Sequence, residues 1–187
     1  MKNGFTLIEL MLAVAILAVV LTLGVPSLTE IIKNNRTASQ INGLISTLNF
    51  ARSEAVKLGN VAVTICVSTD QATCNRIPTW ESGWIVFRDT NADGDLDAGE
   101  TLLRVQPALS GGNTLRTSGF VDTDRIQFAN RGTTNQTGTF TLCDDRRETK
   151  AYGVIINVSG QARTATDDDA PNDDIRNNHN GVNLVCP

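Results

Sequence analysis

The sequence has a single histidine, His179, among its 187 residues, and it lies in a polar stretch rich in Asp and Asn. Enzymes that activate a Ser or Cys nucleophile need a base beside it, and His most often supplies that base. No Ser/His/Asp arrangement and no pair of carboxylates at a recognisable strand end can be assigned. We therefore expect a protein without enzymatic activity, in which His179 is a solvated loop residue.

Cysteine is also scarce, and the Cys-x-x-Cys spacing of zinc sites is absent. The four cysteines are Cys66, Cys74, Cys143 and Cys186. An even number without metal-ligand partners favours two disulfides formed in an oxidising compartment. Three connectivities are open. We favour Cys66–Cys74, because the two residues are close in sequence, and Cys143–Cys186, because that bond would fix an otherwise free C-terminus.

Charge is almost absent from the first part of the chain. Phe5–Val25 contains one ionisable residue, Glu9, and a helix of about 20 residues crosses a hydrocarbon layer of ~30 Å. A secretory signal has a basic region and a shorter apolar stretch, whereas here only Lys2 is basic and the run is too long, so we expect it to remain attached. Lys2 places the N-terminus in the cytoplasm and the rest of the chain outside. A carboxylate in hydrocarbon costs at least ~2.5 kcal/mol, so Glu9 should have a partner or a function.

The spacing of apolar residues predicts one long helix. These residues continue three or four positions apart from Leu28 to Val56, which is a helical stripe. With Gly59 as a C-cap, the helix should run from Phe5 to about Leu58, kinked where Pro26 removes a hydrogen bond. The part before Pro26 is apolar all round, and the amphipathic part after it needs a domain to lie against.

The second part of the chain has the pattern of short strands. Its segments are β-branched or aromatic and are separated by Gly, Asn and Asp. They are residues 61–67, 83–89, 101–105, 125–130, 139–144, 152–160 and 182–186. The polar stretch Thr166–Gly181 has too little apolar surface to order itself and is predicted as a surface loop. The predicted fold class is α+β, with a long N-terminal helix kinked near Pro26 and packed on an antiparallel β-sheet or sandwich.

The N-terminus carries a specific motif, Gly4-Phe5-Thr6-Leu7-Ile8-Glu9, followed by the apolar helix. It closely resembles the class III signal of type IV pilins and type II secretion pseudopilins. The resemblance implies that a prepilin peptidase cuts between Gly4 and Phe5 and that Phe5 is then N-methylated. It also implies that Glu9 meets the N-terminal amine of a neighbouring subunit. Such a pair would set the axial register, because leaving either charge unpaired among packed helices costs several kcal/mol.

The resemblance implies a type IV pilin-like organisation. The expected segments are a leader peptide at 1–4, a transmembrane and polymerisation helix at 5–26, an amphipathic helix at 27–59 and a β-rich extracytoplasmic domain at 60–187. The implied partners are the prepilin peptidase, other major and minor pilins or pseudopilins, the inner-membrane assembly platform and the inner membrane. The protein is expected to span the inner membrane once, with its domain in the periplasm, and then to enter a pilus or pseudopilus filament.

The resemblance extends beyond the signal. Asn49–Val56, the segment Trp80–Asp89 and the acidic run after it are similar to the FimU/FimT/GspH branch of minor pilins and pseudopilins. The implied function is that of a minor pilin that assembles through its N-terminal helix into a type IV pilus and helps prime or cap the filament. The alternatives are a GspH-type secretion pseudopilin, a DNA-binding FimT-like pilin in DNA uptake, and a single-pass membrane protein with an adhesive domain. Trp84 and Phe87 are expected in the core.

The run from Asp89 to Glu100 fits the twelve-residue calcium loop pattern, with Gly94 at the sharp turn and Leu96 at the apolar position. The candidate ligands are Asp89, Asn91, Asp93, Asp95, Asp97 and Glu100, with Asp95 contributing its backbone carbonyl. Ca²⁺ is the one cofactor that the sequence suggests. Against it, strands rather than helices flank the run, Asp, Asn and Gly also suit an exposed hairpin turn, and Arg88 and Arg104 could neutralise the carboxylates.

Nucleic-acid binding is disfavoured. FimT-like members that bind DNA share a Gly-Arg-x-Arg loop, and this chain has Gly160-Gln161-Ala162-Arg163, with Arg163 as the one arginine retained. The sequence pI of 4.9 and the Asp-rich segment 167–174 oppose attraction to phosphates. Arg163 is therefore only a candidate phosphate contact.

Overall fold

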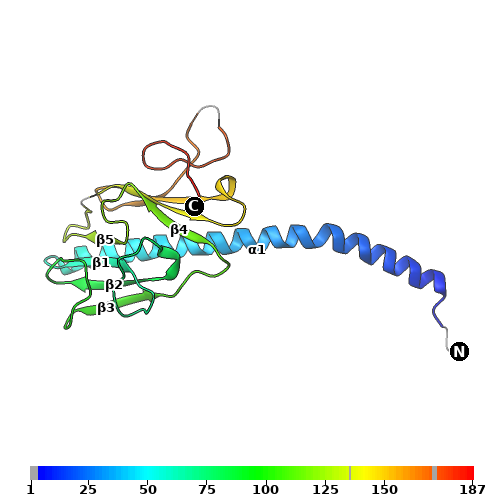
Figure 1. The fold of residues 1–187 in the computed structure, drawn as a ribbon, viewed down its shortest axis with the longest axis horizontal. Coiled ribbons are helices and arrows are strands. Elements are labelled where there is room, and N and C mark those ends of the chain that lie inside the picture. The colour runs from blue at the N-terminus through cyan, green and yellow to red at the C-terminus, as the bar shows by residue number, and fades with distance from the viewer. Residues whose placement is uncertain (1–3, 135, 170–171) are drawn as a thin grey trace. The chain divides into compact units, whose positions relative to one another are not determined.

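The computed structural model describes residues 4–134, 136–169 and 172–187, so Met1–Asn3 of the predicted leader lie outside the described residues. The chain divides into two compact units, Met1–Arg36 and Thr37–Pro187. One helix, α1 (Leu7–Leu58), belongs to both (Figure 1). It ends as expected at Gly59, whose φ is +71° and whose N–H donates to the carbonyl of Ala55 at 3.2 Å.

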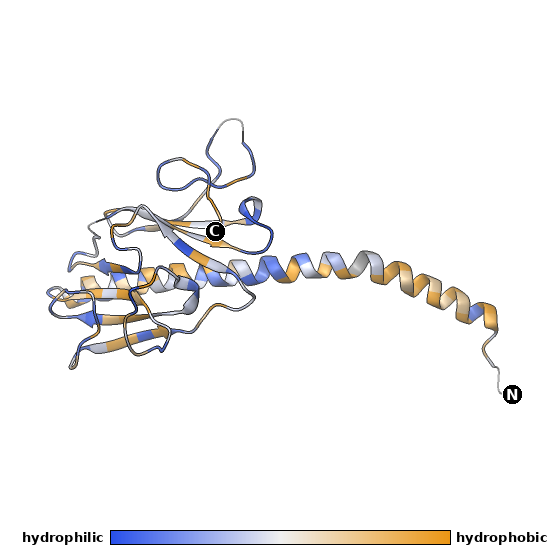
Figure 2. Cartoon of the chain, in the orientation of Figure 1, coloured by the Kyte–Doolittle hydropathy of each residue, from blue (hydrophilic) through white to orange (hydrophobic). Residues whose placement is uncertain are grey.

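The first unit consists of apolar helix. Every large apolar side chain that the structure describes from Phe5 to Val25 is more than half exposed, and Figure 2 shows this part of α1 as mostly hydrophobic, interrupted by one hydrophilic band near its start. Helix α1 is long and apolar enough to cross a membrane. Pro26 lies inside α1, and the helix continues through it. The kink expected there stays a prediction.

The second unit is a sandwich of two four-stranded antiparallel sheets with the end of α1 between them. In strand order, the first sheet contains β3 (Thr101–Gln106), β2 (Trp84–Asp89), β1 (Ala62–Val67) and β5 (Arg125–Phe128). The second contains β4 (Thr114–Ser118), β6 (Gly138–Cys143), β7 (Tyr152–Ile156) and β8 (Ala162–Thr164). Two short 3₁₀ helices, η1 (Trp80–Ser82) and η2 (Glu148–Lys150), complete the described elements.

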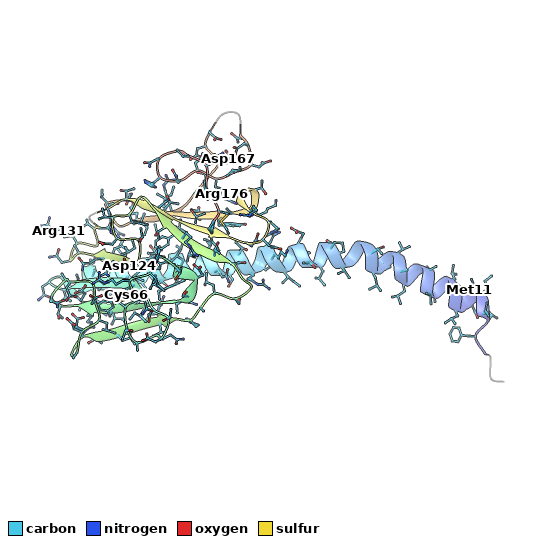
Figure 3. The ribbon with its side chains drawn as sticks, viewed as in Figure 1. Met11, Cys66, Asp124, Arg131, Asp167 and Arg176 are labelled. Carbon is cyan, nitrogen blue, oxygen red and sulfur yellow. A yellow bond between two sulfur atoms is a disulfide. The ribbon has the colours of Figure 1, made fainter. Side chains whose placement is uncertain are left out.

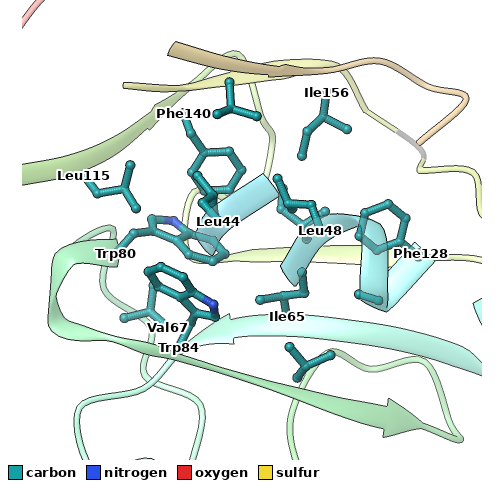
Figure 4. Packing of buried hydrophobic residues seen from close by; sticks show 14 of the residues in the cluster. Leu44, Leu48, Ile65, Val67, Trp80, Trp84, Leu115, Phe128, Phe140 and Ile156 are labelled. Atoms are coloured by element: carbon teal, nitrogen blue, oxygen red, sulfur yellow. The ribbon is translucent and has the colours of Figure 1, made fainter. Parts of the chain in front are cut away.

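The core is formed where the apolar stripe of α1 meets both sheets. Leu44 and Leu48 lie between Phe140 of the second sheet and Ile65 of the first (Figure 4). Strands β1, β2 and β6 are buried along almost their whole length, so the face of each sheet that does not meet the helix is also covered. Trp84, which was expected in the core, is 1% exposed. The predicted α+β fold, with a long helix packed on an antiparallel sandwich, is confirmed.

One predicted strand is absent among the described residues, and two strands that form were not predicted. The segment 182–186 is not a strand, and only the bridge Asn177–Asn183 forms there. Its alternation arises because Leu184 packs beside Gly153 while the valines on either side of Leu184 are exposed. Strands β4 and β8 went unpredicted, because they contain few apolar residues and depend on their neighbours for pairing.

Candidate functional site

The N-terminus of α1 is capped by its own side chains. Glu9 Oε2 accepts hydrogen bonds from Thr6 N at 2.8 Å and Thr6 Oγ1 at 2.9 Å, and Glu9 N donates to Thr6 Oγ1 at 3.3 Å. This reciprocal arrangement is a capping box, which satisfies N–H groups that the first turn leaves without partners. Sequence reasoning missed this partner of Glu9, although the Thr-x-x-Glu spacing signals it.

The expected processing site is open to solvent. Gly4 is exposed, and a side chain added to it would have no atom within 4 Å. Phe5 is 91% exposed and precedes the first helical residue, Leu7. The peptide bond between Gly4 and Phe5 therefore lies in exposed chain without regular secondary structure, where a protease can reach it.

The structure contains the disulfides Cys66–Cys74 and Cys143–Cys186, which are the pairings favoured from the sequence. Asp70 lies inside the shorter disulfide loop. Hydrogen bonds from Thr73 and from the backbone N–H of Ala72 hold the pKa of Asp70 well below its usual range. These hydrogen bonds consequently favour the ionised form of the Asp70 carboxyl in this turn.

The acidic loop Asp89–Glu100 begins inside the protein. Asp89 ends β2 and is 0% exposed, and its Oδ2 atom accepts hydrogen bonds from Thr64 Oγ1 (2.7 Å), Gln127 Nε2 (2.9 Å) and Gly94 N (3.0 Å). Neighbouring strands β1 and β5 thus hold its carboxylate through Thr64 and Gln127. Its Oδ1 atom is buried without a hydrogen-bond partner.

Hydrogen bonds within the loop hold the other candidate ligands. The backbone N–H of Asp93 donates to Asn91 Oδ1 at 3.3 Å, and the backbone N–H of Asp95 donates to Asp93 Oδ1 at 2.9 Å. Glu100 closes the loop by accepting hydrogen bonds from Thr90 N at 2.6 Å and Asp97 N at 3.1 Å.

The apolar position of this loop is occupied as the pattern requires. Leu96 packs against the buried cluster of Cys66, Ile85 and Phe87 on the outer face of the first sheet. The loop is therefore anchored at both its polar beginning and its apolar eighth position.

Two arginines neutralise part of the loop, but they are not the two expected. Arg76 forms an ion pair with Asp95, and Arg125 Nη1 lies 3.6 Å from Asp95 Oδ1. Arg104 instead lies over the ring of Phe50, 4.3 Å from its centroid. Arg88 Nε is buried without a hydrogen-bond partner. The expectation for Arg88 and Arg104 was wrong, because folding brings residues distant in sequence to the loop.

A second acidic group lies near the C-terminus. Among the described residues, Asp167, Asp169 and Asp173 are the one set of three acidic side chains with oxygens within 4.8 Å of one another (Figure 3). Burial, together with the neighbouring Asp169 carboxyl, raises the pKa of Asp167 above its ordinary value. Sequence reasoning treated this segment only as a source of negative charge.

The polar stretch around this group is held by specific contacts. Arg176 lies over the ring of Tyr152 at 4.1 Å and donates to the carbonyl of Ala151 at 2.6 Å. Asn177 is 3% exposed. His179, predicted as a solvated residue, is half-buried and contacts the Thr139 hydroxyl at 3.0 Å through Nδ1. That prediction was wrong, because a polar side chain can pack where a strand offers it a hydroxyl.

Three of the described arginines from the β half lie on different parts of the domain. Arg163 lies exposed on β8 opposite Ile155. Arg125 pairs with Asp124 at 2.8 Å, and Arg146 pairs with Asp144 at 2.6 Å. Arg125 and Arg146 are therefore neutralised within the domain.

Family comparisons agree with this architecture. A model of the type II transport protein GspH matches residues 40–160, which is more than half of the chain. The chain belongs to the GspH family. A model of the prokaryotic N-terminal methylation motif matches residues 1–25 of this GspH-family chain. Both regions were identified from sequence as resembling minor pilins and pseudopilins, and this identification is confirmed.

Solved structures of similar fold include two crystal forms of the type IV minor pilin FimU from Pseudomonas aeruginosa. One has a TM-score of 0.58 at 22% identity and covers 74% of this chain and 95% of its own. The other has a TM-score of 0.53 at 22% identity, covering 72% and 96%. The minor pseudopilin EpsH of Vibrio cholerae has a TM-score of 0.49 at 12% identity, covering 72% and 99%. No curated protein sequence matches significantly.

Proposed function

We propose that this GspH-family protein is a minor pilin that assembles through its N-terminal helix into a type IV pilus and helps to prime or cap the filament. The observation that carries the proposal is the exposed apolar half of α1, which begins at the Thr6–Glu9 capping box and follows an accessible Gly4–Phe5 bond. An all-round apolar helix is stable only in lipid or among other helices. The filament would supply the second environment after the membrane supplied the first.

In this proposal the chain spans the inner membrane with its β domain in the periplasm. A prepilin peptidase removes Met1–Gly4, and the assembly platform passes the mature subunit to other pilins. The protein's role is structural rather than enzymatic. The likeness in fold to FimU supports a pilus, and the two disulfides suit a domain exposed beyond the cell envelope.

A type II secretion pseudopilin is the second candidate, because the family model that matches describes a type II transport protein. Deleting the gene distinguishes the two: loss of surface pili with normal secretion supports the pilus, and the reverse supports the pseudopilus. DNA uptake is the weaker alternative, since Arg163 stands alone on its strand.

Processing is the first test. Co-expression with a prepilin peptidase should shorten the protein by Met1–Gly4 and leave a methylated Phe5, both of which intact-mass spectrometry detects. Gly4→Val should block the cut, because a branched side chain fills the accessible site. An unchanged mass in the wild-type protein would overturn the proposal.

The role of the Glu9 charge in filament assembly can be tested separately from the capping of α1 by Glu9. Glu9→Gln retains a side chain that fits a capping box but loses the charge, whereas Thr6→Ala weakens the cap and retains the carboxylate. We expect Glu9→Gln and Glu9→Ala to be cleaved normally yet incorporated into filaments at least tenfold less, because an unpaired amine is costly among packed helices. Thr6→Ala should assemble. Equal defects in Thr6→Ala and Glu9→Gln would show that capping alone explains the motif.

A further inference from the structure

The buried oxygen of Asp89 is the starting point. Burying a carboxylate oxygen away from both solvent and a hydrogen-bond donor is unfavourable, so a buried group of this kind usually has a partner. Asp89 Oδ1 has none among the described groups, whereas Oδ2 accepts three hydrogen bonds, one of them from Gly94 inside the loop. The carboxylate therefore contacts the loop through Oδ2 and keeps a second, buried oxygen without a donor, and Asp89 stands at position one of the calcium pattern.

The two arginines beside the loop leave the predicted ligands available. Both pair with the side chain of Asp95, and Asp95 occupies position seven, which ligates through its backbone carbonyl rather than its carboxylate. The carboxylate neutralised by Arg76 and Arg125 is thus the one that the pattern does not use. Arg125 is still a positive charge close to the loop, since its Nη1 atom donates to the carbonyl of Asp93 at 3.4 Å.

A neutral donor now holds the exposed carboxylates together. Asn91 Nδ2 donates to Asp93 Oδ2 at 2.9 Å and to Asp97 Oδ2 at 3.0 Å. The two oxygens thereby share one donor, as they would share a cation. Turning the Asn91 amide over would replace this donor with its carbonyl oxygen, which is the ligand that position three supplies.

We infer that the Asp89–Glu100 loop binds one Ca²⁺ ion. The ligands are Asp89 Oδ1, the Asn91 side-chain carbonyl, the Asp95 backbone carbonyl and the carboxylates of Asp93, Asp97 and Glu100. Binding draws these oxygens closer together and satisfies the buried oxygen of Asp89. The inference depends on the domain alone and stands whether or not the protein enters a pilus.

The neighbouring charges set the affinity. Two guanidinium groups near the loop oppose a dication, and three of the ligands lie on exposed chain that must be ordered. We expect a dissociation constant of ~10⁻⁴ to 10⁻³ M, which is the range of extracellular modules. At tenfold excess over this value, the melting temperature should rise by about 3–6 °C.

The test uses the full chain in detergent micelles and Ca²⁺ alone, with calorimetry and thermal melting as readouts. Asp97→Asn and Glu100→Gln should each weaken binding roughly tenfold or more, because each removes a ligand charge. Asp122→Asn is the matched control, since Asp122 is an exposed carboxylate outside the loop that lines the same pocket as Asp93 and Gly94, and this variant should bind Ca²⁺ within about threefold of wild type. Asn91→Asp should bind several-fold more tightly and melt at a lower temperature without Ca²⁺, because a third carboxylate replaces the shared donor.

Three results would overturn the inference. The first is the absence of heat and of any melting shift at about 10 mM Ca²⁺, far above the expected dissociation constant. The second is an equal loss of Ca²⁺ affinity in Asp122→Asn and Asp97→Asn, which would show that general negative charge, rather than a defined site, attracts the ion. The third is retention of binding in Glu100→Gln together with its loss in Asp169→Asn, which would assign the ion to the C-terminal acidic group instead.

Discussion

At the scale of single residues, one glycine joins three parts of the domain. Gly160 has φ of +74°, and a Cβ on it would lie 2.0 Å from the carbonyl oxygen of Gly132. The same oxygen accepts a hydrogen bond from Arg52 Nε of α1 at 3.1 Å. The turn between β7 and β8, the turn at Gly132 and the helix therefore meet where only glycine fits.

Gly160→Ala should lower the free energy of unfolding by roughly 2–5 kcal/mol, from left-handed strain of ~1–2 kcal/mol plus overpacking of ~1–3 kcal/mol. Gly181→Ala is the control, because Gly181 has φ of +73° but open space around it, so it should lose only the strain contribution. Denaturant titration followed by the fluorescence of the buried tryptophans measures both. Equal losses would contradict the steric argument.

Residue-level reasoning from sequence worked where spacing alone defines a role and failed where the fold supplies the neighbour. The calcium pattern and the buried Trp84 could be read from sequence. The partners Arg76 and Arg125 could not, because they come from outside the loop and from another strand. The contact between His179 and Thr139 joins residues that nothing in the sequence relates.

At the scale of elements, the two disulfides differ in how much chain they enclose. Cys66 and Cys74 are separated by 8 residues, and Cys143 and Cys186 by 43. In the chain-entropy description, closing the shorter loop stabilises the fold by about 2.5 kcal/mol and closing the longer one by about 4 kcal/mol.

Removing the longer disulfide with Cys143→Ala and Cys186→Ala should therefore reduce the free energy of unfolding more than removing the shorter one with Cys66→Ala and Cys74→Ala. Denaturation of both double variants under one set of conditions measures the difference. A larger loss for the shorter disulfide would show that packing around the fully buried Cys66 outweighs chain entropy.

Helices and strands whose own apolar residues recur at a regular spacing were predictable from the sequence. Strands that depend on pairing with their neighbours were not. Helix α1 and six strands follow from apolar spacing and turn residues. Strand β4 carries one buried apolar residue, Leu115, and β8 has three residues, so neither has a pattern until β6 and β7 are in place. The segment 182–186 has the alternation of a strand, but a disulfide and the packing of Leu184 account for it.

At the scale of the whole molecule, the net charge is negative, and four arginines form ion pairs within the domain. The formal net charge is −4, and the ion pairs of Arg76, Arg116, Arg125 and Arg146 neutralise arginines within the domain. Long-range attraction to a polyanion needs a positive surface, and the net negative charge of the chain opposes it.

We therefore expect the full chain to show no retention on duplex DNA at about 50 mM salt, where phosphate contacts are strong. Arg163→Ala should leave that result unchanged. A mobility-shift titration tests both, and retention that weakens steeply with salt and falls in Arg163→Ala would instead support DNA uptake.

The bond between Cys143 and Cys186 also determines how the domain would carry a mechanical load. A pull between α1 and the C-terminus passes from one sulfur to the other and bypasses the 43-residue span between them. Without that bond, this span would lengthen by about 150 Å when stretched, at roughly 3.5 Å per residue. The polar loop, its acidic group and strands β7 and β8 are thus shielded from tension, and the second sheet can keep its contacts with the helix while the molecule is under strain.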